Sequence, residues 1–90
     1  MTLLSICIPT YNHAVYLEQA LSRLLSLPVV RDGVVEVVVS DNASSDGTQI
    51  VAERFASQYP RTVRYFRNAE NVRDANFALA LSRGTGEFRK

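Results

Sequence analysis

The sequence predicts an α/β fold, a parallel sheet with flanking helices in the chain order β-α-β-α-β-α-β. Short segments rich in Val and Ile alternate with longer segments whose apolar residues recur every three or four positions. This alternation is typical of parallel strands joined by right-handed helical crossovers. With 90 residues, of which 47% are hydrophobic and 21% charged, the chain has the size and composition of one domain.

The first strand and helix are predicted at Leu3–Ile8 and His13–Ser26. The strand segment is short, mostly apolar and rich in Ile, and we expect Pro9 to close it. Pro28 is expected to end the helix, because proline cannot continue one. One apolar stripe marks the buried side of this helix and is formed by Leu17, Ala20, Leu21, Leu24 and Leu25.

The second strand, Val34–Ser40, contains five Val in seven residues. These β-branched side chains are crowded in a helix and fit a central strand. Asp46 is placed to cap a helix over Gly47–Gln58, with Gln49 reaching back toward the cap, and Pro60 ends that helix.

A third strand is indicated by Val63, Tyr65 and Phe66, and a third helix is predicted at Ala75–Arg83. Gly84 is the expected stop at the end of this helix. The last residues, Glu87–Lys90, are expected to open a fourth strand.

Composition excludes several classes of function. Ten Lys and Arg against nine Asp and Glu give a formal net charge of +1, so we expect no nucleic acid partner. Nine of the ten basic residues are Arg, scattered along the chain, and we interpret most of them as solvated surface. The single Cys7 forms no disulfide within the chain, which favours a reducing, cytoplasmic location.

Function is expected in the loops after the first two strands, because ligands bind outside the carboxyl ends of parallel strands. The first loop, Pro9–His13, joins a rigid Pro, a hydroxyl, an aromatic ring and an amide. Tyr11 is suited to lie against a heterocycle, while Thr10 and the backbone reach its polar edge. In the alternative interpretation Pro9 ends the strand, Asn12 caps the helix and Tyr11 covers the edge of the core.

The second loop begins with Asp41, directly after the Val-rich strand. An ionised carboxylate there accepts a hydrogen bond from a base N–H or from ribose hydroxyls. Asp41 precedes the turn and caps no obvious helix, so a binding role and a structural role are both open. Residues 44–47, Ser-Ser-Asp-Gly, are typical of a tight turn and a helix cap.

Several other kinds of site are not indicated. The sequence holds no glycine-rich dinucleotide motif and no Walker phosphate loop. His13 has no cluster of Cys or His around it and no Asp-x-Asp pair occurs, so the sequence assigns no metal ligand. No set of nucleophile, base and orienting residue is evident, and we assign no catalytic residue.

Three stretches together resemble the amino-terminal part of family 2 glycosyltransferases, enzymes of the GT-A type that use nucleotide-activated sugars. They read SICIPTYNHAVYLEQAL, EVVVSDNASSDGT and NVRDANFALALSRGTGEF. The order of the three stretches is more specific than any one alone, and the resemblance extends over Leu4–Phe88.

The resemblance implies that Thr10, Tyr11 and Asp41 contact the base and ribose of a sugar nucleotide. Pro9 and Asn12 would shape the first loop.

The resemblance extends to one Arg and to a cofactor. Arg73 matches a region that approaches the nucleotide, although it also suits a solvated residue at a helix start. A divalent cation, Mn or Mg, is implied for the full-length enzyme. Its acidic motif follows the Gly-Glu-aromatic strand, and the chain stops at Lys90, before that motif.

We therefore expect residues 1–90 to form the amino-terminal nucleotide-sugar-binding part of one glycosyltransferase domain, truncated before the acidic metal motif. The full-length enzyme would transfer a sugar from a nucleotide diphosphate sugar to a glycan, lipid or protein acceptor, and this chain alone would be inactive. The alternatives are a noncatalytic nucleotide-binding or regulatory α/β module and a purely structural α/β domain.

Two further expectations follow from the truncation. The first strand would keep an exposed edge, which favours a homo-oligomer. The enzyme would be cytoplasmic, and any membrane association would use parts outside this chain.

Overall fold

The computed structural model describes residues 3–31, 34–72, 75–86 and 88–89. Its strands are β1 (Leu4–Thr10), β2 (Val35–Asp41), β3 (Val63–Arg67) and β4 (Phe88–Arg89). They form one parallel sheet in the order β3-β2-β1-β4. The predicted fold class and the predicted parallel sheet are both confirmed. Glu87 and Lys90, which the sequence assigned to the last strand, lie outside the described residues.

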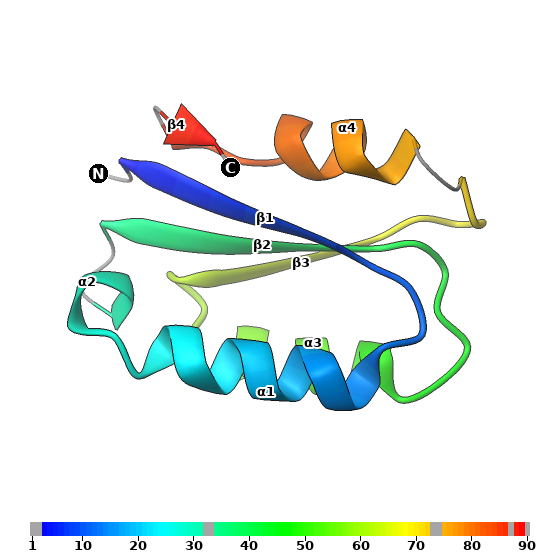
Figure 1. Ribbon diagram of the computed structural model, residues 1–90, viewed down its shortest axis with the longest axis horizontal. Helices are drawn as coiled ribbons and strands as arrows, with labels where there is room; N and C mark the ends of the chain where they lie inside the picture. The colour runs from blue at the N-terminus through cyan, green and yellow to red at the C-terminus, as the bar shows by residue number, and fades with distance from the viewer. Residues whose placement is uncertain (1–2, 32–33, 73–74, 87, 90) are drawn as a thin grey trace.

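The helices are α1 (Ala14–Leu25), α2 (Pro28–Arg31), α3 (Thr48–Gln58) and α4 (Ala75–Ser82). Helices α1 and α3 lie together on one face of the sheet, and α4 lies on the opposite face (Figure 1). Because the strands are parallel, the carboxyl ends of β1, β2 and β3 meet at one edge, where the loops to α1, α3 and α4 begin.

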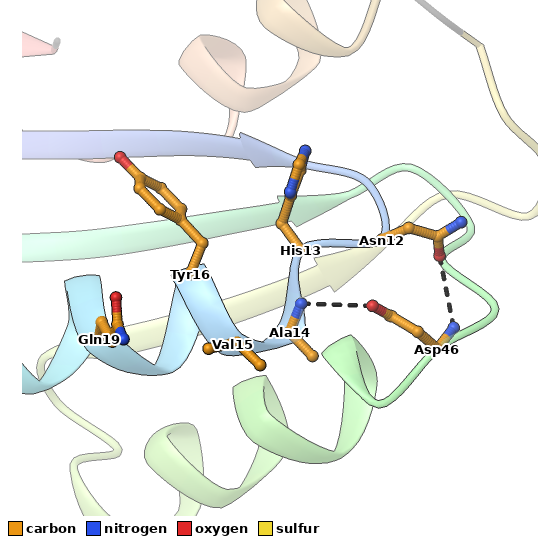
Figure 2. Close-up of a pocket in the computed structure, with 7 residues that line it drawn as sticks. All are labelled: Asn12, His13, Ala14, Val15, Tyr16, Gln19 and Asp46. Atoms are coloured by element: carbon orange, nitrogen blue, oxygen red, sulfur yellow. Dashed lines mark hydrogen bonds between the residues drawn. The ribbon is translucent and has the colours of Figure 1, made fainter.

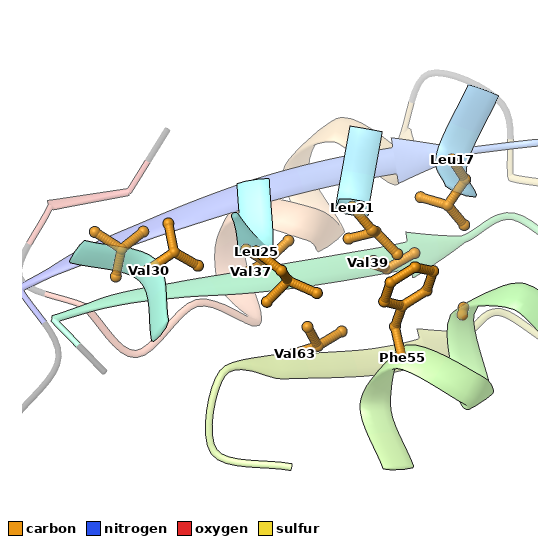
Figure 3. Packing of buried hydrophobic residues seen from close by; sticks show 10 residues of the cluster. Leu17, Leu21, Leu25, Val30, Val37, Val39, Phe55 and Val63 are labelled. Atoms are coloured by element: carbon orange, nitrogen blue, oxygen red, sulfur yellow. The ribbon is translucent and has the colours of Figure 1, made fainter. Parts of the chain in front are cut away.

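The hydrophobic core fills the space between the sheet and the α1 and α3 face (Figure 3). The apolar stripe predicted for the first helix faces inward, since Leu17, Leu21 and Leu25 are buried there. Alternate residues of β2 meet this stripe, as a strand requires. The buried cluster consists of Leu17, Leu21, Leu25, Val30, Val35, Val37, Val39, Ala52, Phe55 and Val63.

The α4 face of the sheet is held by polar contacts. Ser40 Oγ donates to Asn76 Oδ1 at 2.7 Å, and Arg83 Nη1 donates to Ser40 Oγ at 2.6 Å. Nearby, Arg64 Nη1 donates at 3.0 Å to Glu36, which is buried. Arg64 and Arg83 are therefore exceptions to the interpretation of the Arg residues as solvated surface.

Strand β4 pairs with only the first two residues of β1, Leu4 and Ser5. The main-chain N–H of Gly86 donates to Ser5 Oγ at 2.7 Å. A Cβ at Gly86 would lie 2.7 Å from the Ser5 nitrogen, so only glycine permits this close approach.

Pro9 does not close the first strand, because β1 continues to Thr10. The carbonyl of Thr10 faces β2 and accepts from the Asn42 N–H at 2.9 Å, so the preceding residue faces the opposite edge. No other described strand pairs with Pro9 on that edge, and the missing N–H costs no ladder hydrogen bond.

Two predictions near the helix ends are wrong. The helix before Pro28 already ends at Leu25, and Pro28 instead begins the short helix α2, where its missing N–H is not needed. Gln49 does not reach back to a cap, because its Nε2 donates to Glu53 at 2.9 Å.

Candidate functional site

The candidate site lies where β1 and β2 end side by side. Thr10, the last residue of β1, is the register partner of Asp41, the last residue of β2. The Asn42 N–H donates to the Thr10 carbonyl at 2.9 Å and continues the ladder past both strand ends. The two loops singled out from the sequence are therefore neighbours.

Asn12 ties these loops together. Its φ is 51°, in the left-handed region that asparagine tolerates better than most residues. Asn12 Oδ1 accepts from the N–H groups of Ser45 at 2.8 Å and Asp46 at 3.4 Å, while its own N–H donates to Ser44 Oγ at 2.9 Å. The alternative in which Asn12 caps the following helix is wrong, since the N-cap of α1 is His13.

The Asp46 carboxylate accepts hydrogen bonds from the first residues of two helices. Its Oδ2 accepts from the Ala14 N–H of α1 at 3.3 Å (Figure 2). Its Oδ1 accepts from the Thr48 N–H of α3 at 2.9 Å and from the Thr48 hydroxyl. The hydrogen bonds from Thr48 hold the pKa of Asp46 below its usual value. Asp46 is not the N-cap of α3, which is Gly47, but its carboxylate accepts from the first residue of α3 and also from the first residue of α1.

The Asp41 side chain is completely buried. Its Oδ1 accepts from the Ser44 N–H at 3.0 Å, and its Oδ2 accepts from the Tyr65 hydroxyl at 2.5 Å and from Arg67 Nη1 at 3.1 Å. Burial raises the pKa of Tyr65, and its hydrogen bond to Asp41 raises it further, so the phenol remains a donor. Asp41 thus organises the second loop and the end of β3.

Asn42 connects the second loop to the segment that follows β3. Its Oδ1 accepts from Asn68 Nδ2 at 3.1 Å and from the Val72 N–H at 2.8 Å. Its Nδ2 donates to Asn71 Oδ1 at 2.5 Å. One buried amide therefore holds residues 68–72 beside the two loops. Arg73, the next residue and a predicted nucleotide contact, lies outside the described residues.

The predicted loop residues differ in their accessibility. Thr10 is buried and Pro9 is half-buried, whereas 44% of Tyr11 is exposed. Within the described part of the chain, the Tyr11 side chain makes no hydrogen bond, and the exposed part of this residue is accessible to a ligand. Asp41, in contrast, is covered on all sides.

A surface hollow of about 420 Å³ opens beside these loops at the start of α1 (Figure 2). It shares Asn12 and Asp46 with the candidate site but does not include Thr10, Tyr11 or Asp41. We therefore treat it as a neighbouring feature. It is lined by Asn12, His13, Ala14, Val15, Tyr16, Gln19 and Asp46.

Nowhere among the described residues do three or more His, Cys, Asp or Glu side chains come together. In the same residues, no helix has the length and apolar character needed to cross a membrane.

Sequence reasoning missed the partners of Asp41. Arg67 is its register partner on β3, and Tyr65 lies on the same face two residues earlier. The sequence does place a carboxylate, Asp41, and a guanidinium, Arg67, at the ends of two strands. This pattern predicts an ion pair only once β2 and β3 are known to be neighbours in this register.

The comparisons agree on one family. The sequence model described as "Glycosyl transferase family 2" matches residues 5–88. Abequosyltransferase RfbV of Salmonella typhimurium (strain LT2) is 36% identical over 87 residues, which cover 96% of this chain and 26% of that protein. The GalNAc(5)-diNAcBac-PP-undecaprenol beta-1,3-glucosyltransferase of Campylobacter jejuni is 32% identical over 90 residues, which cover 98% of this chain and 28% of that protein.

A solved structure gives the same picture. The mannosyltransferase PcManGT from Pyrobaculum calidifontis, in complex with GDP-Man and Mn2+, superposes with a TM-score of 0.82 at 32% identity. The match covers 96% of this chain and 25% of that one. The chain thus spans about a quarter of the length of the proteins that it matches.

Proposed function

The chain belongs to glycosyltransferase family 2, and we propose that it is the nucleotide-recognition half of an enzyme that transfers a sugar from a nucleotide diphosphate sugar to an acceptor. The observation that carries this proposal is the joined pair of loops at the carboxyl edge of β1 and β2, the edge where ligands of parallel sheets bind. The relatives are named as glycosyltransferases, and one solved neighbour holds GDP-Man.

In this proposal the exposed ring of Tyr11 stacks on the base, and the Thr10 strand end lines the base pocket. Pro9 and Asn12 set the path of the first loop, and Asp41 accepts a hydrogen bond from the base or the ribose. Arg73, which follows the segment 68–72 in the sequence, is proposed to approach the nucleotide.

The cation and the chemical step are assigned to the remainder of the enzyme. The neighbour with GDP-Man also holds Mn2+, whereas the described residues here do not fit such an ion. We propose that residues 1–90 are one part of a longer glycosyltransferase domain, that the ligands of the cation lie in the remainder, and that residues 1–90 alone do not transfer sugar. Turnover by the isolated chain in a transfer assay would contradict this division.

Nucleotide titration tests the binding function. The chain is titrated by calorimetry with UDP, GDP and dTDP, with and without Mn, and Asp41→Asn is compared with Glu53→Gln, an exposed carboxylate on α3. Loss of a hydrogen bond to a charged group should weaken binding about 5- to 150-fold in D41N and leave E53Q unchanged. Equal affinity for the wild type and D41N, with both proteins folded, would refute the role of Asp41. The absence of binding by the folded wild-type chain would refute independent nucleotide recognition.

We also propose that the exposed edge of β1 pairs with a second copy. Among the described residues, β4 covers only Leu4 and Ser5, and residues 6–10 of β1 meet no other strand on that side. Unpaired strand edges recruit further strands. Light scattering should therefore show dimers at high micromolar concentration, and a monomer there would contradict the proposal.

For the whole enzyme we propose a cytoplasmic location, with any membrane contact made outside this chain. The single Cys7 excludes an intrachain disulfide, and one relative is named for an acceptor linked to undecaprenol. Cell fractionation of the full-length protein tests this location, and recovery from an extracellular fraction would contradict it.

A further inference from the structure

Asp41 poses an accessibility problem for any ligand. The residue has no exposed surface, and three donors already occupy its carboxylate. An ionised carboxylate offers about four acceptor positions, so about one remains free. Because Asp41 has no exposed surface, a base or ribose reaches it only if one of the groups that cover it moves away.

The three donors differ in how easily they move. The Ser44 N–H is part of a loop that Asn12 holds through the Ser44 hydroxyl. Tyr65 is half-buried and its side chain packs against the hydrophobic core.

Arg67 differs from both, because it ends β3 and its side chain is 35% exposed. Its recorded bond to the carboxylate is a single one, from Nη1 to Oδ2 at 3.1 Å. The Arg67 guanidinium can be solvated when it moves, because its side chain is partly exposed, whereas the buried Asp41 carboxylate then needs the incoming ligand donor to compensate its charge.

We propose that Arg67 is a displaceable cover of Asp41 that sets nucleotide affinity by competing with the ligand for Oδ2. This inference rests on the proposed nucleotide-binding function. When the ligand donor arrives, the Arg67 guanidinium turns into solvent and the ligand N–H or O–H takes its place. The buried carboxylate therefore keeps three donors throughout. The apparent affinity for the nucleotide equals the affinity of the open state multiplied by the fraction of time that Arg67 is turned away from Asp41.

The binding test uses Arg67→Met, which keeps the length of the side chain but removes its donors. If Arg67 competes with the ligand, R67M should bind UDP or GDP about two- to fivefold more tightly than the wild type. Arg67→Lys should bind like the wild type, because it keeps a cation that can cover Asp41. Arg54→Met is the matched control, since Arg54 pairs with Glu18 on the surface at 3.3 Å. Weaker or unchanged binding by R67M would overturn the inference.

A second test needs no nucleotide. A water-soluble carbodiimide and an amine label accessible carboxylates, and peptide mass spectrometry locates the label. In the wild type, Glu18 should be labelled and Asp41 protected, because the Glu18 side chain is 51% exposed and Asp41 is fully buried. In Arg67→Ala, which removes the covering side chain together with its donors, labelling of Asp41 should rise several-fold. If R67A does not fold, Arg67→Ser, whose side chain is also too short to cover Asp41, serves with the same expected direction.

The two tests separate the two hypotheses. An Asp41 that stays protected in a folded R67A or R67S overturns the cover, whatever the nucleotides do. Increased labelling of Asp41, together with no nucleotide binding by the wild type or R67M, supports the cover and overturns the proposed function instead.

Discussion

Replacement of Asn12 separates two contributions that hold the binding loops together. Asn12 adopts a φ of 51° and accepts from the N–H groups of Ser45 and Asp46. Asn12→Gly keeps the backbone conformation but loses the acceptor, whereas Asn12→Ala loses the acceptor and keeps a Cβ in the left-handed region without the tolerance of asparagine for that conformation. The two variants should therefore lose different amounts of stability.

The magnitudes follow from the geometry. The bond to Ser45 at 2.8 Å is a full hydrogen bond, while the one to Asp46 at 3.4 Å adds little. Loss of the acceptor and the added freedom of glycine in the unfolded chain should cost about 1–2 kcal/mol in N12G. N12A lacks the added freedom of glycine, but its Cβ in the left-handed region costs about 1–2 kcal/mol, so N12A should be about 1 kcal/mol less stable than N12G.

Urea unfolding of the isolated chain measures this difference. With an m-value of about 1 kcal/mol/M, the midpoints of N12G and N12A should differ by about 1 M. Ala43 is the matched control, because it holds a φ of 62° with a Cβ already present. Ala43→Gly should therefore stabilise the chain, by about 0.5 kcal/mol. Equal midpoints for N12G and N12A, or destabilisation by A43G, would refute the reasoning on backbone conformation.

Two further predictions concern the rest of the sheet. Gly86→Ala should destabilise the chain by about 1–3 kcal/mol, because the new Cβ would lie 2.7 Å from a main-chain nitrogen of β1. The control is Gly47→Ala, whose Cβ would lie 3.9 Å from its nearest neighbour and which should change stability by less than about 0.5 kcal/mol. Urea midpoints measure both variants, and equal losses would contradict the steric argument. Burial raises the pKa of Glu36, but hydrogen bonds from Thr85 and Arg64 outweigh burial and hold the pKa below 4.5 in the folded chain. The contribution of Glu36 to stability is therefore complete above pH 4.5 and is lost as the pH falls through its pKa in the folded chain. Urea midpoints of Glu36→Gln should accordingly fall less between neutral and acid pH than those of the wild type, and parallel curves would contradict this sign.

The order of strands and helices was predictable because each has a local cause. The Val-rich β2 and the apolar stripe of α1 are read directly from residue type and spacing, and both are confirmed. The missed features depend on partners distant in sequence. Pro9 remains in a strand because its nitrogen faces an edge without a described partner strand. The short helix at Pro28 had no clear signal, since the same proline also suits a helix end.

The location of the candidate site was predictable from the sequence, but the hydrogen bonds between its residues were not. The rule for parallel sheets selected the loops after β1 and β2, and the structure joins them. Nothing in the sequence revealed that Asn12 accepts a hydrogen bond from the second loop, or that Asp46 accepts one from the first residue of α1. Two of the three donors on Asp41 likewise come from β3, 24 and 26 residues away in the chain. Such contacts follow from register, which local patterns do not determine.

The contact between Gly86 and Ser5 has a consequence for the kinetics of folding. Its two residues are 81 positions apart, and every strand pair in the sheet is parallel. Loops that long must close before their contacts contribute, which slows folding. On the ribosome, β1 and β2 can pair once β2 has been made, whereas β1 waits for β4 until nearly all 90 residues have emerged. During that interval Leu4 and Ser5 of β1 are also without a partner strand on that edge, so chaperone demand should be greater before β4 is added than after.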